Sequence, residues 1–396
     1  MSGSAYAIVV CGAHLNGLSV CRELQYFNLK EVLLLDSHSY FAKYSNSVKK
    51  FIKVKENLAN FEETIQNLVE LYGKVMLIPT NDIFIDAIFH LQEPLRSKLI
   101  VPYSIKLVNT YQSKAAQLEI CKNIGVNVPR TVLLSHDAKE LNVENFQYDW
   151  IAKPTTRIDE TGFGFRNLIC RYNELGEQHL IKQLNELQKA IKNGVELIVS
   201  EVIHAEEDGV FSYCCYKSRD GEITSEWCGR KLSQHPNEFG VFSSATSSNL
   251  QTLRTLGRKI ATSFDTFGFI QPEFKYCSSR KKLYLMEINF RPMMWHHLGH
   301  LNGKSLIGEM VRDNLVASLD TERNTSEFTR CKYIFMTHEI SNLILRKGYI
   351  SHFRRIINLR RVTKFAVWSS KDPLPAIIGM RFLMLKVIGA CIKRLF

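Results

Sequence analysis

The first hundred residues constrain the fold most, because they read as repeated strand–helix–strand units. Residues 5–12 form a continuous apolar run ending at a glycine, as expected of a strand buried on both faces. Residues 14–27 have the pattern of a helix, and residues 31–36 form a second apolar strand. Such a unit builds a parallel sheet, and two further strands alternate with helices in the same way. The sequence therefore predicts a doubly wound α/β domain over residues 1–108.

The turn after the first strand allows one alternative, a nicotinamide dinucleotide site. Gly12 and Gly17 are spaced as G-x-x-x-x-G, and Asp36 ends the second strand. In the dinucleotide motif a middle glycine lets the backbone approach the pyrophosphate. Here His14 takes that place, so a nicotinamide oxidoreductase is disfavoured.

Two strand-like segments near residue 280 carry the most informative polar residues. Residues 270–277 and 283–292 flank a short polar stretch, as the two strands of a hairpin do. If Cys277 pairs with Leu283, the polar residues of both strands fall on one face of the hairpin.

In that register Glu273 lies opposite Glu287, and Gln271 lies opposite Asn289. Like charges facing each other across strands destabilise a sheet. Two carboxylates and an amide oxygen are compatible if a hard cation lies between them, and Mg²⁺ is bound in this way together with substrate phosphates. The hairpin therefore suggests a metal–nucleotide site, and a half-exposed hairpin with unrelated acids is the alternative.

Between the first domain and the hairpin, a series of apolar segments are each followed by characteristic polar residues. A strand over residues 149–154 ends in Lys153-Pro154 and precedes a loop with two glycines. A later strand ends in Glu201-Val202-Ile203, with acidic residues six and seven positions beyond Glu201. Gly229-Arg230-Lys231-Leu232 follows, and then the sequence from Glu287 to Arg291.

In this order the chain resembles the ATP-grasp superfamily over about residues 5–310. The resemblance is closest to the carboxylate–amine ligase branch, which includes D-aspartate ligase-like proteins and biotin carboxylase relatives. It implies a doubly wound pre-ATP-grasp domain and a two-subdomain ATP-grasp fold over residues 109–312. The remaining residues 313–396 are expected to form a basic helical extension. Phe290 stands where the family often has proline, and acidic residues within the loop 155–165 leave its phosphate contacts in doubt.

The resemblance also implies a role for each candidate residue. Those expected to hold ATP are Lys114, Lys153, Gly162, Gly164, Glu201, Val202, Ile203, and either Glu207 or Asp208. Those expected to hold one or two Mg²⁺ ions, with Mn²⁺ as an alternative, are Glu273, Glu287 and Asn289. Those expected to act on the acyl phosphate or substrate carboxylate are Arg291, Lys231 and Arg230.

The implied activity is ATP-dependent joining of a small-molecule carboxylate to an amine, through an acyl phosphate and with release of ADP and phosphate. The acceptor could belong to cell-surface glycan or lipid-linked precursors. The alternative is a non-catalytic, regulatory ATP-binding protein on the same fold. Homodimers are common among such ligases, and the residues do not decide this. His296, His297 and His300 are interpreted as structural or substrate-pocket residues rather than zinc ligands.

The charge is concentrated at the C-terminal end of the chain. The formal net charge is +12, and from Cys331 onward there are thirteen Lys and Arg residues but only two acidic ones. The nearly neutral remainder argues against nucleic-acid binding. Residues 376–396 are apolar with interspersed basic residues, which favours either a helix on an anionic membrane surface or a helix covering the core. A membrane-spanning helix is the less favoured alternative, because Arg381 and Lys386 would be costly near the bilayer centre. Scattered cysteines and the lack of a signal peptide indicate a cytoplasmic protein, with peripheral contact at the inner membrane face left open.

Overall fold

The computed structural model describes residues 7–29, 31–135, 141–155, 167–206, 208–237, 239–315 and 331–395. Contacts divide the chain into two compact units. The larger unit contains residues 1–108, 207–271 and 289–396, and the smaller unit contains residues 109–206 and 272–288. The division differs from the three consecutive segments expected from the sequence, and those boundaries remain a prediction.

The N-terminal part of the larger unit is a parallel sheet with the strand order β3-β2-β1-β4-β5. The strands are β1 (Ala7–Cys11), β2 (Val32–Asp36), β3 (Lys50–Lys53), β4 (Val75–Pro79) and β5 (Leu99–Ile100). In the centre of the sheet Ile8 pairs with Val32 on one side and Met76 on the other. Every residue of β1, β2 and β4 is buried, which explains their uninterrupted apolar sequences.

Short helices connect these strands. They are α1 (Leu15–Gln25), η1 (Phe41–Tyr44), η2 (Glu56–Leu58), α2 (Phe61–Tyr72), α3 (Asp82–Phe89) and α4 (Glu93–Arg96). In α2 the buried residues Phe61, Ile65, Leu68 and Val69 recur at helical spacing, so the helix presents one apolar stripe to the core. The predicted doubly wound domain is confirmed.

The smaller unit is built on an antiparallel sheet with the order β6-β9-β7-β8. Its strands are β6 (Thr131–Leu134), β7 (Trp150–Pro154), β8 (Leu168–Cys170) and β9 (Leu197–Glu201), and its helices are α5 (Ile105–Gln112), which begins in the larger unit, α6 (Lys114–Asn123), η3 (Val143–Phe146) and α8 (Tyr172–Lys192). Leu180, Leu184 and Leu187 of α8 pack with Trp150 in the core of this unit. Helices α5 and α6 are separated at Ser113, whose side chain caps α6 by accepting a hydrogen bond from the N–H of Ala116.

A seven-stranded sheet has the order β14-β13-β10-β11-β12-β15-β16. The strands are β10 (Val210–Lys217), β11 (Ile223–His235), β12 (Val241–Ser247), β13 (Gly268–Cys277), β14 (Lys282–Asn289), β15 (Cys331–Ile334) and β16 (Val362–Phe365). The helices α9 (Gln251–Ser263), α10 (His297–Leu301) and α11 (Leu306–Asn314) lie between these strands in the sequence. Strands β13 and β14 confirm the predicted hairpin elements, and the β13 strand continues from the larger unit into the smaller one.

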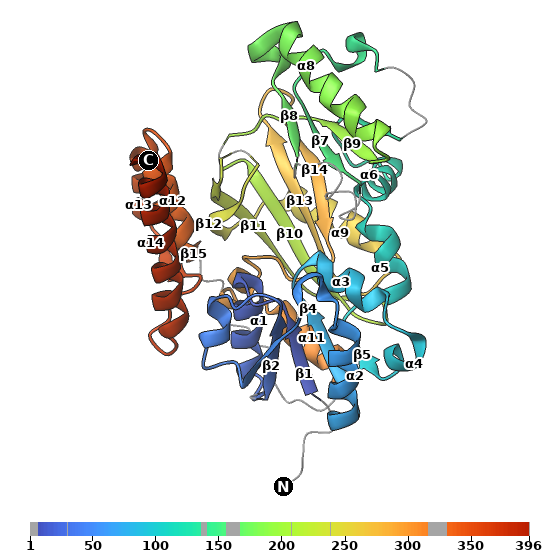
Figure 1. Cartoon of the computed structure of the whole chain (residues 1–396), viewed down its shortest axis with the longest axis vertical. Coiled ribbons are helices and arrows are strands. Elements are labelled where there is room, and N and C mark those ends of the chain that lie inside the picture. Colours follow the sequence, from blue (N-terminus) through green and yellow to red (C-terminus); the bar gives the residue numbers. More distant parts are fainter. Residues whose placement is uncertain are drawn as a thin grey trace. The chain divides into compact units, whose positions relative to one another are not determined.

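The C-terminal segment is part of the larger unit rather than a purely helical tail. Strand β15 pairs with β12 and β16 pairs with β15, so both extend the seven-stranded sheet. The helices α12 (Met336–Leu345), α13 (Tyr349–Asn358) and α14 (Leu374–Leu395) are grouped together in Figure 1, drawn in red. Buried Glu339 of α12 accepts hydrogen bonds from hydroxyl groups of β11, β12 and α13: Ser233, Ser243, Ser244 and Tyr349.

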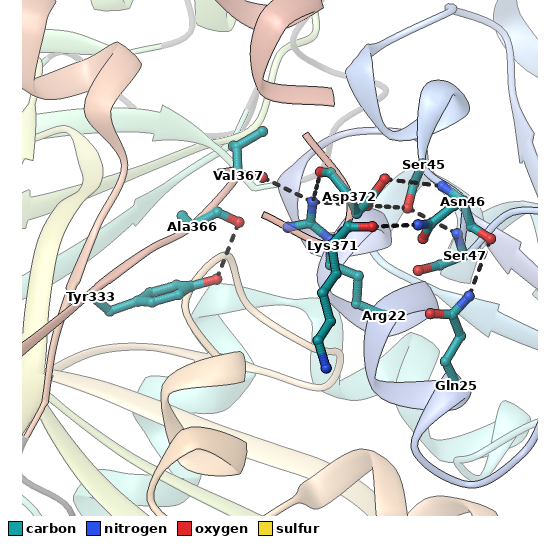
Figure 2. A network of polar contacts seen from close by, with 10 residues as sticks. All are labelled: Arg22, Gln25, Ser45, Asn46, Ser47, Tyr333, Ala366, Val367, Lys371 and Asp372. Carbon is teal, nitrogen blue, oxygen red and sulfur yellow. Dashed lines mark hydrogen bonds and ion pairs between the residues drawn. The ribbon is translucent and has the colours of Figure 1, made fainter. Parts of the chain in front are cut away.

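A second polar network attaches the segment between β16 and α14 to the N-terminal sheet region (Figure 2). Asp372 accepts hydrogen bonds from the Ser45 hydroxyl at 2.6 Å and from the backbone N–H of Asn46 at 3.0 Å. Arg22 of α1 donates to the same carboxylate and to the carbonyl oxygens of Val367 and Asp372. These contacts join segments more than 300 residues apart in the sequence.

Candidate active site

The predicted metal ligands lie on two neighbouring strands. Glu273 is on β13, and Glu287 and Asn289 are on β14. All three are half-buried, while the residues that follow Glu273 and Glu287, Phe274 and Ile288, are buried. Because side chains alternate along a strand, Glu287 and Asn289 share one face of β14. The carboxylates are therefore held on regular backbone rather than on loops.

Gln271 of β13 shares a strand face with Glu273 and is fully buried. Among the described residues, neither Oε1 nor Nε2 of Gln271 has a hydrogen-bond partner. Leaving a buried polar group unpaired costs about 1–3 kcal/mol, so a polar ligand on this face would be stabilising. Within the described ranges no three His, Cys, Asp or Glu side chains gather as a metal site. Two carboxylates and an amide fit Mg²⁺, which keeps positions for water and phosphate oxygens.

A positioning residue that the sequence analysis missed is Gln117 of α6. Its Nε2 donates to the carbonyl of Ile288 at 3.0 Å, and its Oε1 accepts from the N–H of Ile288 at 2.8 Å. The buried amide thus pairs with the backbone between Glu287 and Asn289, along the outer edge of β14. Asn127 pairs with the same strand through Leu285 N–H at 2.9 Å. No motif marks Gln117, and its only local signal is its position one turn after Lys114.

The two lysines expected at the phosphates both begin or end an element of the smaller unit. Lys114 is the first residue of α6, directly after the capping Ser113, and is half-buried. Lys153 is half-buried near the end of β7, where its backbone pairs with Ile198 of β9. Gly162 and Gly164 lie outside the described residues. The phosphate contacts expected of the glycine loop therefore remain a prediction.

Glu201, expected at the adenine, ends β9 and is paired within the smaller unit. Its carboxylate contacts the guanidinium of Arg280, which comes from the turn between β13 and β14. The N–H of Val202 donates to the carbonyl of Asp149 at 2.8 Å, so that donor is already used by the sheet. Val202 and Ile203 are both buried. Adenine recognition by this segment would therefore rely on groups other than the Val202 N–H.

Arg230 and Lys231, both candidates for binding phosphate or carboxylate, are consecutive residues of β11 and so point to opposite faces of the sheet. Arg230 Nη1 lies 3.2 Å from Oδ2 of Asp208, the candidate ribose ligand. Lys231 is buried, and its backbone pairs with Ala245 of β12. Glu207 lies outside the described residues. The structure thus brings Arg230 to Asp208 but separates it from Lys231.

Arg230 of β11 lines a cavity of about 330 Å³ within the larger unit. Its lining residues are Phe211, Arg230, Thr246, Ser247, Ser248, Asn249, Leu250 and Arg361. Arg361 comes from the C-terminal segment and donates to the carbonyl oxygen of Ser247 at 3.1 Å. The two guanidinium groups make this cavity suited to an anionic group.

Arg291, the candidate for the acyl phosphate, is oriented by Asp82 at the start of α3. Its Nε lies 2.7 Å from Oδ1 of Asp82, and its Nη2 lies 3.1 Å from Oδ2. Asn16 of α1 donates to the carbonyl oxygens of Thr80 and Pro292, both at 3.0 Å. Asp82 and Thr80 follow the carboxyl end of β4, and ligands of parallel α/β sheets bind at that edge. Asp82 therefore holds the Arg291 guanidinium beside the carboxyl edge of the N-terminal sheet.

Asp36, considered for a nicotinamide ribose, has an internal structural role. Its Oδ2 accepts from the N–H of Ala13 at 2.6 Å, and its Oδ1 accepts from the N–H of His38 at 3.2 Å. At Gly12, where φ is +117°, a Cβ atom would lie 2.2 Å from the Thr80 hydroxyl. The glycine is thus explained by close packing of the turn on β4, with no need for a dinucleotide.

The three histidines after Arg291 surround buried Glu23 of α1. His297 Nδ1 lies 2.8 Å from Glu23 Oε1, His296 Nε2 lies 3.2 Å from the same oxygen, and the Ser305 hydroxyl donates to Oε2. Burial opposes ionisation of Glu23, but the charge and hydrogen bonds of His296 and His297 outweigh it and hold its pKa well below the usual range. Burial lowers the pKa of His300 to about 4. The three histidines and Ser305 thus surround one buried carboxylate.

The arrangement of sheets and helices can be compared with known proteins. Searches against protein-family models and against curated protein sequences found no match. Among solved structures, the chain resembles an ADP complex of an N5-carboxyaminoimidazole ribonucleotide synthetase, with 14% identity, a TM-score of 0.61, and coverage of 87% of this chain and 85% of that chain. The corresponding synthetase from Thermus thermophilus has 15% identity and a TM-score of 0.59, with coverage of 82% and 81%.

Biotin carboxylase from Campylobacter jejuni, solved with an ATP analogue, is also similar, with 14% identity, a TM-score of 0.59, and coverage of 78% of this chain and 70% of that chain. These neighbours have the ATP-grasp fold of carboxylate–amine ligases. The chain therefore has the ATP-grasp fold, and the resemblance seen in its sequence is confirmed at the level of the fold.

Proposed function

We propose that the protein is an ATP-dependent ligase that joins a carboxylate to an amine. The observation that carries the proposal is the set of two carboxylates and an amide on adjacent strands β13 and β14 of an ATP-grasp fold. Similar solved structures were determined with ADP, and one with magnesium ADP and bicarbonate. Arg291, two residues beyond Asn289, lies at the edge of the N-terminal sheet, where a carboxylate could be held.

The proposed reaction has two transfers. A carboxylate oxygen forms a bond to the γ-phosphorus of ATP, the bond from that phosphorus to the bridging oxygen breaks, and ADP leaves. The amine nitrogen then forms a bond to the acyl carbon, the carbon–oxygen bond to phosphate breaks, and the amine loses a proton. Because the protein forms no covalent bond, its contribution is positioning and charge stabilisation.

Each candidate residue has one proposed task. Lys114 and Lys153 stabilise negative charge on the phosphates. Glu201 and the backbone groups of Val202–Ile203 other than the Val202 N–H bind adenine, and Asp208 or Glu207 binds the ribose. Arg291, kept in orientation by Asp82, contacts the carboxylate or acyl phosphate. Lys231 and Arg230 are further anion ligands. Glu273, Glu287 and Asn289 would hold Mg²⁺, which supplies charge neutralisation on the phosphates when bound.

The test is calorimetric titration with Mg·ATP, followed by a screen of carboxylates and amines for ADP release. We expect Glu287→Gln and Lys153→Ala to lose Mg·ATP binding. The matched controls are Glu186→Gln and Lys189→Ala, exposed positions on α8, which should bind as the unmodified protein does. Binding retained in Glu287→Gln would contradict the metal assignment.

The same titration separates the ligase from the alternative of a regulatory nucleotide-binding protein. That alternative expects Mg·ATP binding without ADP release for any substrate pair. We further propose glycan or lipid-linked precursors as a substrate class, which the screen tests by including uronic acids and amino acids. A homodimer is a separate proposal, and one similar structure is a biotin carboxylase domain dimer. A cytoplasmic location also remains a proposal.

A further inference from the structure

Exposed large apolar side chains are concentrated in one short part of the chain. Of the twenty-one exposed large hydrophobic residues among those described, eleven lie within residues 344–384. They are Ile344, Leu345, Ile350, Ile357, Val362, Phe365, Trp368, Leu374, Ile377, Phe382 and Met384. Single exposed apolar residues are common, whereas apolar side chains that adjoin one another often mark a binding site, so the placement of these eleven on their elements decides their role.

Helix α13 has two distinct faces. Tyr349 and Ile356, seven residues apart, are buried against the unit, and the Tyr349 hydroxyl donates to Glu339 at 2.6 Å. Ile350 and Ile357, also seven residues apart, are 53% and 44% exposed. Seven residues are about two helical turns, so each pair forms one stripe. The helix is anchored by one stripe and leaves the other uncovered.

Helix α14 repeats this arrangement in its first turns. Pro375 is buried, and Gly379 lies against Phe41 of η1. Leu374, Ile377 and Met384 are exposed at positions that recur about every turn on the other side of the helix. Leu374, Ile377 and Met384 therefore share one side of α14 with exposed Arg381, while exposed Phe382 lies nearer the side of Pro375.

The edge of the seven-stranded sheet contributes to the same segment. Strand β16 is the last strand of the sheet, and its residues Val362 and Phe365 are exposed. Trp368, three residues beyond β16, is 50% exposed. Tryptophan with one exposed edge is typical of residues at membrane–water boundaries. We call the exposed side chains of residues 344–384 the C-terminal surface.

The charge of the C-terminal surface is entirely positive. Its exposed basic residues are Lys347, Arg354, Arg355, Arg360, Lys364, Lys371 and Arg381. The one acidic residue in this segment, Asp372, is buried and paired with Arg22. The structure describes every residue from 344 to 384, so no exposed acidic residue occurs on this surface.

We propose that the C-terminal surface docks the protein on the face of an anionic lipid membrane. Apolar stripes can enter the headgroup boundary while the long basic side chains remain at the lipid phosphates, since lysine and arginine stems are themselves apolar. Each basic residue near such a surface contributes attraction that salt screens. The C-terminal surface combines exposed apolar side chains with exposed basic side chains.

A second copy of the chain and a nucleic acid each fit the C-terminal surface less well than an anionic membrane does. In a twofold dimer the same patch meets itself, so seven exposed cations would face their own copies. Nucleic acid is bound mainly through polar and positively charged contacts and leaves no role for eleven large apolar side chains. Among the described residues no helix is long and apolar enough to cross a bilayer.

The test is co-sedimentation of the 396-residue chain with vesicles of phosphatidylcholine containing phosphatidylserine, compared with pure phosphatidylcholine. We expect binding to the anionic vesicles that weakens as salt is raised. Arg354→Gln with Arg355→Gln should weaken it roughly thirtyfold, from about 1 kcal/mol for each basic residue. Ile350→Glu with Ile357→Glu should weaken it at least as much.

Matched controls lie on the same unit but away from the C-terminal surface. They are Leu71→Glu on α2 and Lys50→Gln with Lys53→Gln on β3, all exposed positions, and they should bind as the unmodified protein does. Absence of binding by folded protein, or equal binding by the α13 variants, would overturn the proposal. Concentration-dependent dimerisation that is lost in the α13 variants, without vesicle binding, would identify a second copy as the occupant instead. Mg·ATP affinity should be unchanged in every variant.

Discussion

Arg22 of α1 forms an ion pair with Asp372, 350 residues later in the chain, with Nη2 and Oδ2 2.9 Å apart. The Asp372 carboxylate also accepts hydrogen bonds from Ser45 and Asn46 (Figure 2). Its negative charge is therefore paired and hydrogen-bonded within the larger unit. It is the single acidic residue after Glu339. The pair attaches the segment that leads into α14, and with it part of the C-terminal surface, to the N-terminal sheet region.

Asp372→Asn should therefore destabilise the protein. Removing one charge of a buried pair leaves the other uncompensated, which costs about 3 kcal/mol in the free energy of unfolding. Urea unfolding monitored by circular dichroism measures this. The control is Asp220→Asn, an exposed residue in the turn between β10 and β11, which should change the free energy little. Equal stability of the two variants would show that the pair contributes nothing.

Gln117→Leu should weaken Mg·ATP binding although Gln117 is not a proposed ligand. Its amide fixes the backbone at Ile288, between Glu287 and Asn289, and loss of such support typically lowers metal affinity about tenfold or more. Calorimetry gives the affinity, and circular dichroism checks the fold. Gln66→Leu, at an exposed position of α2, is the control. Unchanged affinity in Gln117→Leu would mean that the strand edge is held by other contacts.

Asp82→Asn separates substrate positioning from nucleotide binding. Without the two charged contacts from the Asp82 carboxylate, the Arg291 guanidinium loses its orientation. Misplacement of a catalytic group by about 1 Å can lower the rate about a hundredfold. We expect slower ADP release with an Mg·ATP affinity within about twofold of the unmodified value. Asp86→Asn, further along the same helix, should leave both unchanged. Parallel losses of affinity and rate would instead assign Asp82 to the nucleotide site.

Stability should fall as the pH decreases from about 6.5 towards 4. Burial lowers the pKa of His300 and of His338 to about 4 each, while in the unfolded chain both take up a proton near pH 6.5. Within this window the unfolded state binds more protons, so each histidine removes up to about 1.4 kcal/mol per pH unit. The lowered pKa of Glu23 acts at lower pH, because its contribution is present above about 4.5 and is lost below its folded pKa.

Urea unfolding at several pH values tests this dependence. His338→Gln can retain a hydrogen bond to the Phe242 carbonyl but cannot titrate, so its stability should vary less steeply with pH. His90→Gln is a control, since His90 is exposed in the N-terminal part of the chain. An unchanged slope in His338→Gln would contradict the assignment of that proton.

Much of the fold could be predicted because its strands have strong local patterns. Strands β1 and β4 are apolar throughout and β2 is apolar up to Asp36, and this pattern is readable without any partner. Strand β12 was missed, since Val241–Ser247 contains three serines and reads as a loop. Two of those serines donate to Glu339, so the strand is stabilised by a partner about a hundred residues away.

The candidate site could likewise be predicted only in part from the sequence. The order of Lys153, Glu201, Glu287 and Arg291 could be read directly, because short motifs keep their spacing along the chain. The pairing of Arg291 with Asp82 could not, nor the support of Ile288 by Gln117, since these contacts span 209 and 171 residues. Arg230 and Lys231 appeared equivalent until their strand placed them on opposite faces.

The sequence by itself determined the parallel N-terminal sheet, the ATP-grasp resemblance and the excess of positive charge at the C-terminal end. These properties depend on residue types within short windows. The tertiary structure alone decided that β15 and β16 join the sheet, that Asp372 meets Arg22, and that apolar stripes of α13 and α14 stay uncovered. The physical reason is that burial depends on which distant segments pack together, and a local pattern does not specify its partner.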